Sequence, residues 1–324
     1  MFTWRKLGHI YNPCDDTNRP AWRWNFAQGV NSILFDDYVR VYFCCREKPN
    51  KLGQTVSRIC FADLDKKCLT RVIRVSDRPV MEVGGLGCFD EFGMYPFTAV
   101  RYENRIYGYY GGITRCESVP FNAAIGGAIS HDGGNTFIKM GKGPVISYSH
   151  DEPFTVGSPK VRIFNNKWYM FYTAGREWRI TDNQPEVYYK LRMAISDDGI
   201  NWHKLGRDII ADKIGVTEAQ ACGDVTYRNE KYHMFFCYRA SQDFRRNPVY
   251  SYRIGYAVSK DLLTWNRMDE LASIDVSPEV DAFDHEMVAY PHLFDVDKRT
   301  YMLYLGNEVG KFGFGLALLE GELL

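Results

Sequence analysis

One hairpin pattern occurs five times along the chain, and it constrains the fold more than any other feature. Each copy has an apolar strand, a polar turn and a second strand rich in aromatic residues. The copies start at Asn31, Pro96, Pro159, Gly223 and Pro291, which are 65, 63, 64 and 68 residues apart. A unit of about 64 residues has room for four strands, the content of one blade of a β-propeller.

A second pattern occurs in phase with the first. Ser130, Ser196 and Ser259 each end an apolar run, and each is followed by an acidic turn and then an aromatic residue. We interpret Asp132, Asp198 and Asp261 as residues of these turns. The alternative fold is an array of β-sandwich sheets, but the constant phase over five units favours a propeller.

The sequence therefore predicts an all-β, five-bladed β-propeller that forms a single domain over residues 1–324. The expected blades are residues 25–85, 86–148, 149–212, 213–278 and 279–324. A strand expected at residues 3–10 joins the last blade and closes the ring, because that blade ends soon after its third strand, at 312–319. No helix of consequence is needed.

Composition excludes several partner classes. The chain has 40 basic and 40 acidic residues, so no positive excess is available for a nucleic acid backbone. No segment reaches the length of a membrane span or a signal peptide, and we expect a cytoplasmic protein. Nine cysteines without a C-x-x-C motif are typical of reduced, structural thiols. We predict no cofactor, and the sequence leaves the oligomeric state open.

Aromatic hairpins combined with S-x-D-G-x-x-W turns resemble the glycosidase propellers of families 43, 62, 68, 32, 117 and 130, which act on arabinosides, xylosides, fructosides and mannosides. The resemblance covers the whole chain as architecture. The segments Gly87–Glu91, Arg253–Tyr256 and Phe283–Pro291 are similar to glycosidase-like propellers from bacterial surface-polysaccharide gene sets. The resemblance implies a carbohydrate ligand in a central funnel, at the side where each first strand begins.

Aligning the five blades places acidic residues at that side of the ring. Glu91, Glu218 and Glu286 each lie five residues before a hairpin start, and Asp90 and Asp284 precede two of them closely. Two carboxylates are what glycoside cleavage needs, because one protonates the departing oxygen and the other activates water or attacks the sugar. We predict these five residues as catalytic. For the two aspartates, bonding to backbone amides at the strand start is the alternative.

The predicted substrate contacts surround these acids. Arginines and aromatic side chains would hold hydroxyl or carboxylate groups of a sugar by bidentate hydrogen bonds and by stacking. His285 lies between two acids and could tune a carboxylate or bind a hydroxyl group. No spacing of ligands supports a metal site. The predicted contacts are His150, Asp151, Glu152, His285, Arg115, Arg176, Trp178, Arg239, Tyr95 and Tyr290.

The sequence also departs from the families that it resembles. In families 43 and 32 the catalytic acids lie one or two positions before the hairpin proline, and no acid occupies those positions here. A glycoside hydrolase that uses acids farther along the rim is the first hypothesis. A glycoside phosphorylase, with arginines holding phosphate and one acid sufficing, is a variant. A carbohydrate-binding propeller without turnover is the alternative from another class.

Overall fold

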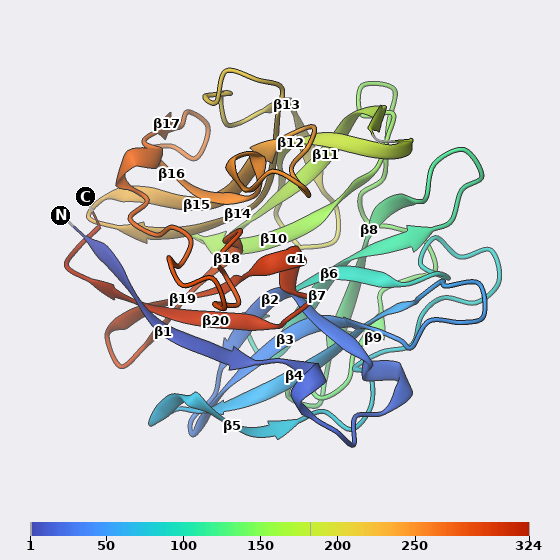
Figure 1. Cartoon of the computed structure of the whole chain (residues 1–324), viewed down its shortest axis with the longest axis horizontal. Helices are drawn as coiled ribbons and strands as arrows, with labels where there is room; N and C mark the ends of the chain where they lie inside the picture. Colours follow the sequence, from blue (N-terminus) through green and yellow to red (C-terminus); the bar gives the residue numbers. More distant parts are fainter. Residues whose placement is uncertain (1, 182, 324) are drawn as a thin grey trace.

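The computed structural model describes residues 2–181 and 183–323. It contains five four-stranded antiparallel sheets around a central axis (Figure 1), so the predicted five-bladed propeller is confirmed. Each innermost strand contacts the innermost strands of both neighbouring blades, which makes a closed ring. In blade order I to V these strands are β2 (Asn25–Leu34), β6 (Met94–Tyr102), β10 (Val156–Phe164), β14 (Glu218–Arg228) and β18 (Ala289–Val296).

The other strands follow outward in each blade. The second strands are β3 (Tyr38–Arg46), β7 (Arg105–Thr114), β11 (Lys167–Thr181), β15 (Lys231–Ala240) and β19 (Arg299–Leu305). The third strands are β4 (Ser57–Asp65), β8 (Asn122–Ser130), β12 (Gln184–Ser196), β16 (Arg253–Ser259) and β20 (Phe314–Glu320). The outermost strands are β5 (Cys68–Val75), β9 (Ile138–Lys139), β13 (His203–Asp208), β17 (Asn266–Arg267) and β1 (Thr3–Tyr11).

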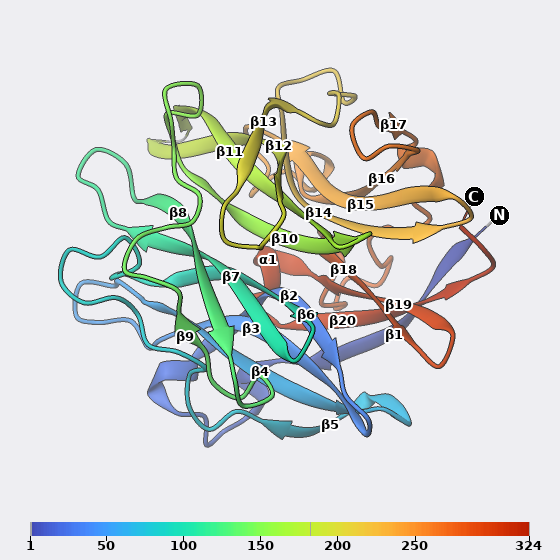
Figure 2. The same cartoon turned by 180° about the vertical axis from the view of Figure 1, so that it is seen from behind.

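The ring closes through blade V. Strand β1 pairs antiparallel with β20, from Thr3 opposite Glu320 to Tyr11 opposite Phe314, as the sequence predicted. Both cartoon views show the start of β1 beside the end of β20 at the edge of this blade (Figures 1 and 2). Trp4 also packs edge-on against Phe235 of blade IV, so the first strand joins two blades.

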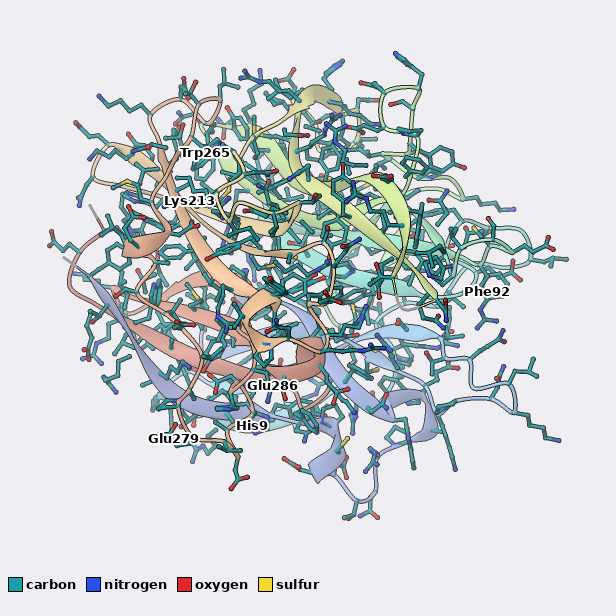
Figure 3. The ribbon with its side chains drawn as sticks, turned by 45° about the horizontal axis from the view of Figure 1, so that its top comes forward. His9, Phe92, Lys213, Trp265, Glu279 and Glu286 are labelled. Carbon is teal, nitrogen blue, oxygen red and sulfur yellow. The ribbon has the colours of Figure 1, made fainter. Side chains whose placement is uncertain are left out.

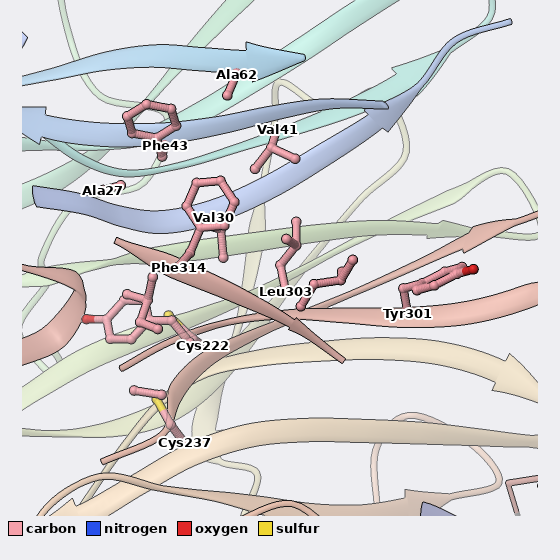
Figure 4. Close-up of a cluster of buried hydrophobic side chains, with 14 of the residues drawn as sticks. Ala27, Val30, Val41, Phe43, Ala62, Cys222, Cys237, Tyr301, Leu303 and Phe314 are labelled. Carbon is pink, nitrogen blue, oxygen red and sulfur yellow. The ribbon is translucent and has the colours of Figure 1, made fainter. Parts of the chain in front are cut away.

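The apolar core lies between the blades. Five clusters of buried side chains occur in the described part of the chain, and most of each cluster comes from two adjacent sheets. Figure 4 shows one of them, in which Val30, Phe43 and Phe314 meet from β2, β3 and β20. Because each blade faces a neighbour on both sides, its inner strands are apolar nearly throughout rather than alternating.

The structure confirms that Asp132, Asp198 and Asp261 are residues of the repeated turns. The hydroxyls of Ser130, Ser196 and Ser259 donate to the carboxylates of Asp132, Asp198 and Asp261 at 2.8, 2.9 and 3.0 Å, and each serine oxygen also accepts from turn amides.

One such turn is held by the preceding blade. The Tyr42 hydroxyl donates to the carbonyl of Gly134 at 2.8 Å, where φ is +81° and a Cβ would lie 2.1 Å from the tyrosine oxygen. Glycine is required there by both conformation and space.

The remaining elements are short. The short helical turn α1 (Asn307–Gly310) lies at the middle of the ring (Figure 1). The described residues also form four 3₁₀ turns: η1 (Pro13–Asp15), η2 (Ala21–Arg23), η3 (Pro248–Tyr250) and η4 (Asp269–Leu271). Within residues 2–181 and 183–323, no helix is long and apolar enough to cross a membrane. All nine cysteines are unpaired.

Candidate functional site

Every innermost strand carries a two-residue bulge at the same level of the channel. The register shifts fall at Gly29–Val30, Tyr95–Pro96, Ser158–Pro159, Cys222–Gly223 and Tyr290–Pro291. Blade I therefore aligns on Val30, and the sequence alignment on Asn31 was wrong by one residue. We call the side where the innermost strands begin the mouth side.

Below the bulges, polar side chains fill the channel. We call Asn31, Lys160, Arg162, Asp224 and His292 the axial network. Arg162 binds both carboxylate oxygens of Asp224 at 2.7 Å, and the Lys160 ammonium donates to the Val30 carbonyl at 2.7 Å. All but Arg162 are almost fully buried. Burial opposes the charge of Asp224, but Arg162, His292 and Lys160 together outweigh it and hold the pKa of that carboxyl well below its usual range.

The axial network joins blades by side-chain bonds to the next backbone. Asp224 accepts from Leu293 N at 2.7 Å, His292 from Ser32 N at 2.8 Å, and Asn31 from Ala99 N at 2.7 Å. Asp224, His292 and Asn31 each directly follow the bulge of their strand. Their hydrogen bonds connect blade IV to V, blade V to I and blade I to II.

Ser32, His292 and Asp224 have the spacing of a nucleophilic triad but not its chemistry. The Ser32 oxygen lies 2.9 Å from His292 Nε2, and His292 Nδ1 lies 3.0 Å from Asp224. However, the lone pair of Nε2 already accepts the backbone N–H of Ser32, and Asp224 is neutralised by Arg162. Burial also lowers the pKa of His292 to about 3, which makes it a poor base. We assign these residues to blade fastening.

Four of the predicted site acids share one arrangement. Each residue lies at the mouth-side start of a blade, is at most 1% exposed and forms an ion pair with a cation on the outermost strand of that blade. The pairs are Asp90–Lys139 at 2.5 Å, Glu152–Lys204 at 2.7 Å, Glu218–Arg267 at 2.6 Å and Asp284–Lys6 at 2.7 Å. The acids therefore tie the innermost part of blades II, III, IV and V to the outer edge of the same blade.

Buried tyrosines complete three of these pairs. The hydroxyls of Tyr110, Tyr172 and Tyr304 donate to Asp90, Glu152 and Asp284 at 3.0, 2.8 and 3.0 Å. Burial raises the pKa of all three phenols, and the adjacent carboxylates raise it further. Carboxylates engaged in this way are not free to exchange protons with a substrate in this conformation.

Glu218 has a further role in its own loop. One carboxylate oxygen accepts from Arg267 and from Gln220, and the other accepts from the amides of Lys213 and Ile214 at 3.1 and 3.3 Å. Glu218 thus fixes the segment that leads into β14.

The other two predicted catalytic glutamates lie nearer to solvent. Glu91 is half-buried and accepts from Gly87 N at 2.8 Å, which closes its own loop. Glu286 is exposed, and within the described residues its carboxylate has no hydrogen bond or ion pair. Figure 3 shows Glu286 beside α1, near the middle of the ring. Among the five acids predicted as catalytic, Glu286 is the one whose carboxylate is free.

The predicted histidine and aspartate contacts lie on the loops. His150 is almost fully exposed, and Asp151 accepts from the Ser149 hydroxyl, the main influence that lowers the pKa of that carboxyl. His285 Nδ1 lies 3.0 Å from the Ser277 carbonyl, so this nitrogen carries the proton.

Three of the other predicted contacts are held by neighbouring side chains. Arg115 binds Gln54 of blade I, Arg176 binds both oxygens of Asp208, and Trp178 packs edge-on against Phe121.

Tyr95, Tyr290 and Arg239 do come together. We call Arg46, Tyr95, Tyr189, Arg239, Tyr252 and Tyr290 the mouth cluster. Tyr95 and Tyr290 stack with ring centroids 6.1 Å apart, and the hydroxyls of Tyr189 and Tyr252 are hydrogen-bonded. Burial raises the pKa of Tyr95 and Tyr290 well above the usual value. Tyr95 and Tyr290 are therefore uncharged at neutral pH.

Two arginines of the mouth cluster have no carboxylate partner among the described residues. Arg239 is 2% exposed and lies 3.6 Å from the Phe244 ring centroid, and its Nε has no hydrogen-bond partner. Burial opposes its charge, but the phenols of Tyr189 and Tyr252 outweigh it and its pKa is raised. Arg46 is half-buried over Phe26, and burial lowers its pKa. Positive charge at the mouth is thus uncompensated, which favours an anionic group there.

Sequence reasoning missed Arg46, Tyr189 and Tyr252. Arg46 ends the second strand of blade I and could have been found there, since Arg239 was predicted near the equivalent end in blade IV. In residues 2–181 and 183–323, no group of three or more His, Cys, Asp or Glu side chains is arranged to hold a metal ion.

Comparisons with known proteins agree with the fold. No established family profile matches the chain. A solved structure described as a glycoside hydrolase superposes with a TM-score of 0.74 at 16% identity, covering 98% of this chain and 92% of that one. The β-1,2-mannobiose phosphorylase of Listeria innocua, solved with β-1,2-mannobiose, superposes with a TM-score of 0.70 at 11% identity over 99% and 96% of the chains.

Two sequence relatives add to this. Part of a β-1,2-mannobiose phosphorylase of Thermoanaerobacter sp. (strain X514) is 32% identical over 99 residues, 30% of this chain and 29% of that protein. The uncharacterized protein Rv1502 of Mycobacterium tuberculosis is 32% identical over 319 residues, 98% of this chain and 99% of that protein. The chain belongs to the same family as Rv1502, a family with the five-bladed propeller fold of glycoside hydrolases and mannoside phosphorylases.

Proposed function

We propose that the chain cleaves a glycosidic bond in a carbohydrate bound at the mouth, and that inorganic phosphate rather than water accepts the sugar. The observation that carries the proposal is the imbalance of charge there. Arg46 and Arg239 lack carboxylate partners, whereas Glu286 is the free acid of the five predicted as catalytic. The fold and the 99-residue similarity to a mannobiose phosphorylase support the same class.

Phosphorolysis needs fewer acids than hydrolysis. Hydrolysis uses two carboxylates, about 5–5.5 Å apart for retention and about 6.5–9.5 Å for inversion. In phosphorolysis, a phosphate oxygen forms a bond to the anomeric carbon while the glycosidic C–O bond breaks. The departing oxygen takes a proton from Glu286 as general acid, and the products are a sugar phosphate and a shortened glycan. Arg46 holds the phosphate, and Tyr95 and Tyr290 provide an aromatic platform for the sugar.

Carbohydrate binding without turnover is the second candidate. It is favoured by the ion pairs that enclose Asp90, Glu152, Glu218 and Asp284. A propeller that only binds its ligand has no need of a free carboxylate pair at the mouth.

The test incubates the protein with β-1,2-mannobiose and with arabino-, xylo- and fructo-oligosaccharides, each with and without inorganic phosphate. Chromatography of sugar phosphates and free sugars measures the products. The proposal expects sugar phosphate from one of these glycans, only when phosphate is present. Glu286→Gln should lower kcat by roughly 10²–10⁴-fold, and Glu91→Gln, which changes a carboxylate bound within its own loop, should not.

The outcomes separate the candidates. Free sugar formed without phosphate identifies a hydrolase instead. Binding by calorimetry with no product under either condition supports the second candidate. Full activity of Glu286→Gln removes that residue from the mechanism.

A further inference from the structure

A pocket opens between blades III and IV. It has a volume of about 540 Å³ and is lined by Tyr188, Lys190, Asp212, Lys213, Gly215, Val216 and Thr217. This volume lies within the range of ligand-binding pockets. One wall is the part of β12 near its start, and the other is the segment 212–217 that leads into the innermost strand of blade IV. Figure 3 shows Lys213 farther from the middle of the ring than Glu286.

The pocket adjoins the mouth cluster through β12. Tyr188 lines the pocket, and Tyr189, the next residue, belongs to the mouth cluster and lies within 3.4 Å of Arg239. Lys190 also reaches the backbone oxygen of Glu218 at 2.6 Å, at the first residue of β14. The pocket and the mouth cluster therefore share strand β12, and the pocket reaches the start of β14.

The wall formed by segment 212–217 is held in place. Glu218 accepts from the amides of Lys213 and Ile214, and Gln220 donates to Asp212 at 3.1 Å. Thr217 contributes its carbonyl to Ser241 N at 2.8 Å. The pocket is therefore largely formed before any ligand arrives, which lowers the entropic penalty of binding.

The chemistry of the lining suits a sugar. The Tyr188 ring is covered on one side by the Arg179 guanidinium, 4.8 Å from the ring centroid, and Arg179 is also 3.4 Å from the Thr217 hydroxyl. An aromatic ring beside hydroxyl, carboxylate and ammonium groups offers both stacking and hydrogen bonds to a ring of hydroxyls.

The charge of the lining favours a neutral ligand. Lys190 is paired with Asp212, and Lys213 with Glu270 at 2.6 Å. Both ammonium groups thus have carboxylate partners, in contrast to Arg46 and Arg239 in the mouth. An anionic or lipid group would find neither free charge nor a continuous apolar surface here.

We infer that this pocket is an outer subsite for a neutral sugar unit, so that the substrate is a glycan of at least three units rather than a disaccharide. The inference rests on the proposed function for the mouth. It assigns Tyr188 as the stacking residue and Glu218 as the residue that positions the pocket wall.

The experiment measures affinity by calorimetry for di-, tri- and tetrasaccharides of the β-1,2-mannan, arabinan, xylan and fructan series. In the series that binds, wild type should bind the tetrasaccharide roughly tenfold more tightly than the disaccharide. Tyr188→Ala should lose that gain and keep the disaccharide affinity. Tyr227→Ala, a change of a 45% exposed tyrosine far along β14, is the matched control and should keep both.

A second variant guards against misfolding. Lys213→Gln keeps the aromatic wall and should reduce the gain partially, with an unchanged melting temperature. Equal affinity for all lengths in wild type, equal loss at all lengths in Tyr188→Ala, or no binding in any series overturns the subsite. Turnover and affinity of the tetrasaccharide that Tyr188→Ala leaves unchanged refute the subsite while leaving the proposed function standing.

Discussion

Replacing Asp224 by asparagine removes a negative charge from the centre of the ring. Its carboxylate is 1% exposed and accepts bonds from Arg162, from Leu293 N and from His292. An asparagine keeps one acceptor oxygen and turns an NH₂ group toward donors. The Arg162 guanidinium then lies largely buried without a counter-charge, and one fastening between blades IV and V is weakened.

The expected loss is about 3–5 kcal/mol of unfolding free energy, the usual result of breaking a buried ion pair on one side. The matched control is Asp295→Asn, which removes an exposed pair with Arg228 and should lose less than about 1 kcal/mol. Urea unfolding followed by tryptophan fluorescence measures both, since the chain has seven tryptophans.

A double variant tests the cause. If the uncompensated guanidinium carries the loss, Arg162→Met combined with Asp224→Asn should recover part of it. Equal urea midpoints for Asp224→Asn and Asp295→Asn would refute the reasoning, because a buried and an exposed pair would then contribute alike.

Four further predictions rest on other features of the structure. Burial lowers the pKa of His292 from 6.5 to about 3, so the unfolded chain takes up a proton that the folded chain does not. Unfolding free energy should fall by about 1.4 kcal/mol per pH unit as the pH drops through that window, and urea midpoints that stay constant from pH 6.5 to 4 would contradict this. Gly134→Ala should destabilise by about 1–3 kcal/mol because its Cβ meets Tyr42, and by more than Gly133→Ala, whose Cβ has open space; equal melting temperatures would contradict the clash. Deleting residues 3–11 exposes the edge of β20, and size-exclusion chromatography should show association or aggregation; a stable monomer with unchanged melting temperature would contradict ring closure by β1. Ser32 should not react with a fluorophosphonate probe. Labelling of the wild type that disappears in Ser32→Ala would show that the Nε2 lone pair of His292 is available as a base after all.

The repeat of about 64 residues was sufficient to predict the five-bladed fold because every blade carries the same local sequence signals. Polar hairpin turns, Ser–Asp turns and an unpaired third strand at the end of the chain each follow from nearby residues. The hairpin start in blade I was placed one residue too late because neither a proline nor a glycine marks it, as Pro96, Pro159, Gly223 and Pro291 do in the other blades.

The acids were harder to interpret from the sequence. Asp90, Glu218 and Asp284 recur at similar positions, a pattern that suggested shared chemistry. The structure supplies another cause, since each pairs with a cation on the outermost strand of its blade. Those partners lie 49 to 278 residues away, and Lys6 even precedes its partner, so no local spacing reveals them. A buried carboxylate needs a cationic partner because it has lost its hydration. An alignment of the five repeats does not show which cation that partner is.

The pairing of β1 with β20 also means that the ring has no natural beginning. Since both ends of the chain lie in one blade, a short linker between them would make that blade a continuous run of four strands. The chain could then be opened at another blade boundary and still form every sheet. Such circular permutants would move the last pairing step of folding from blade V to a chosen blade, and would show whether closing the circle or building the blades sets the folding rate.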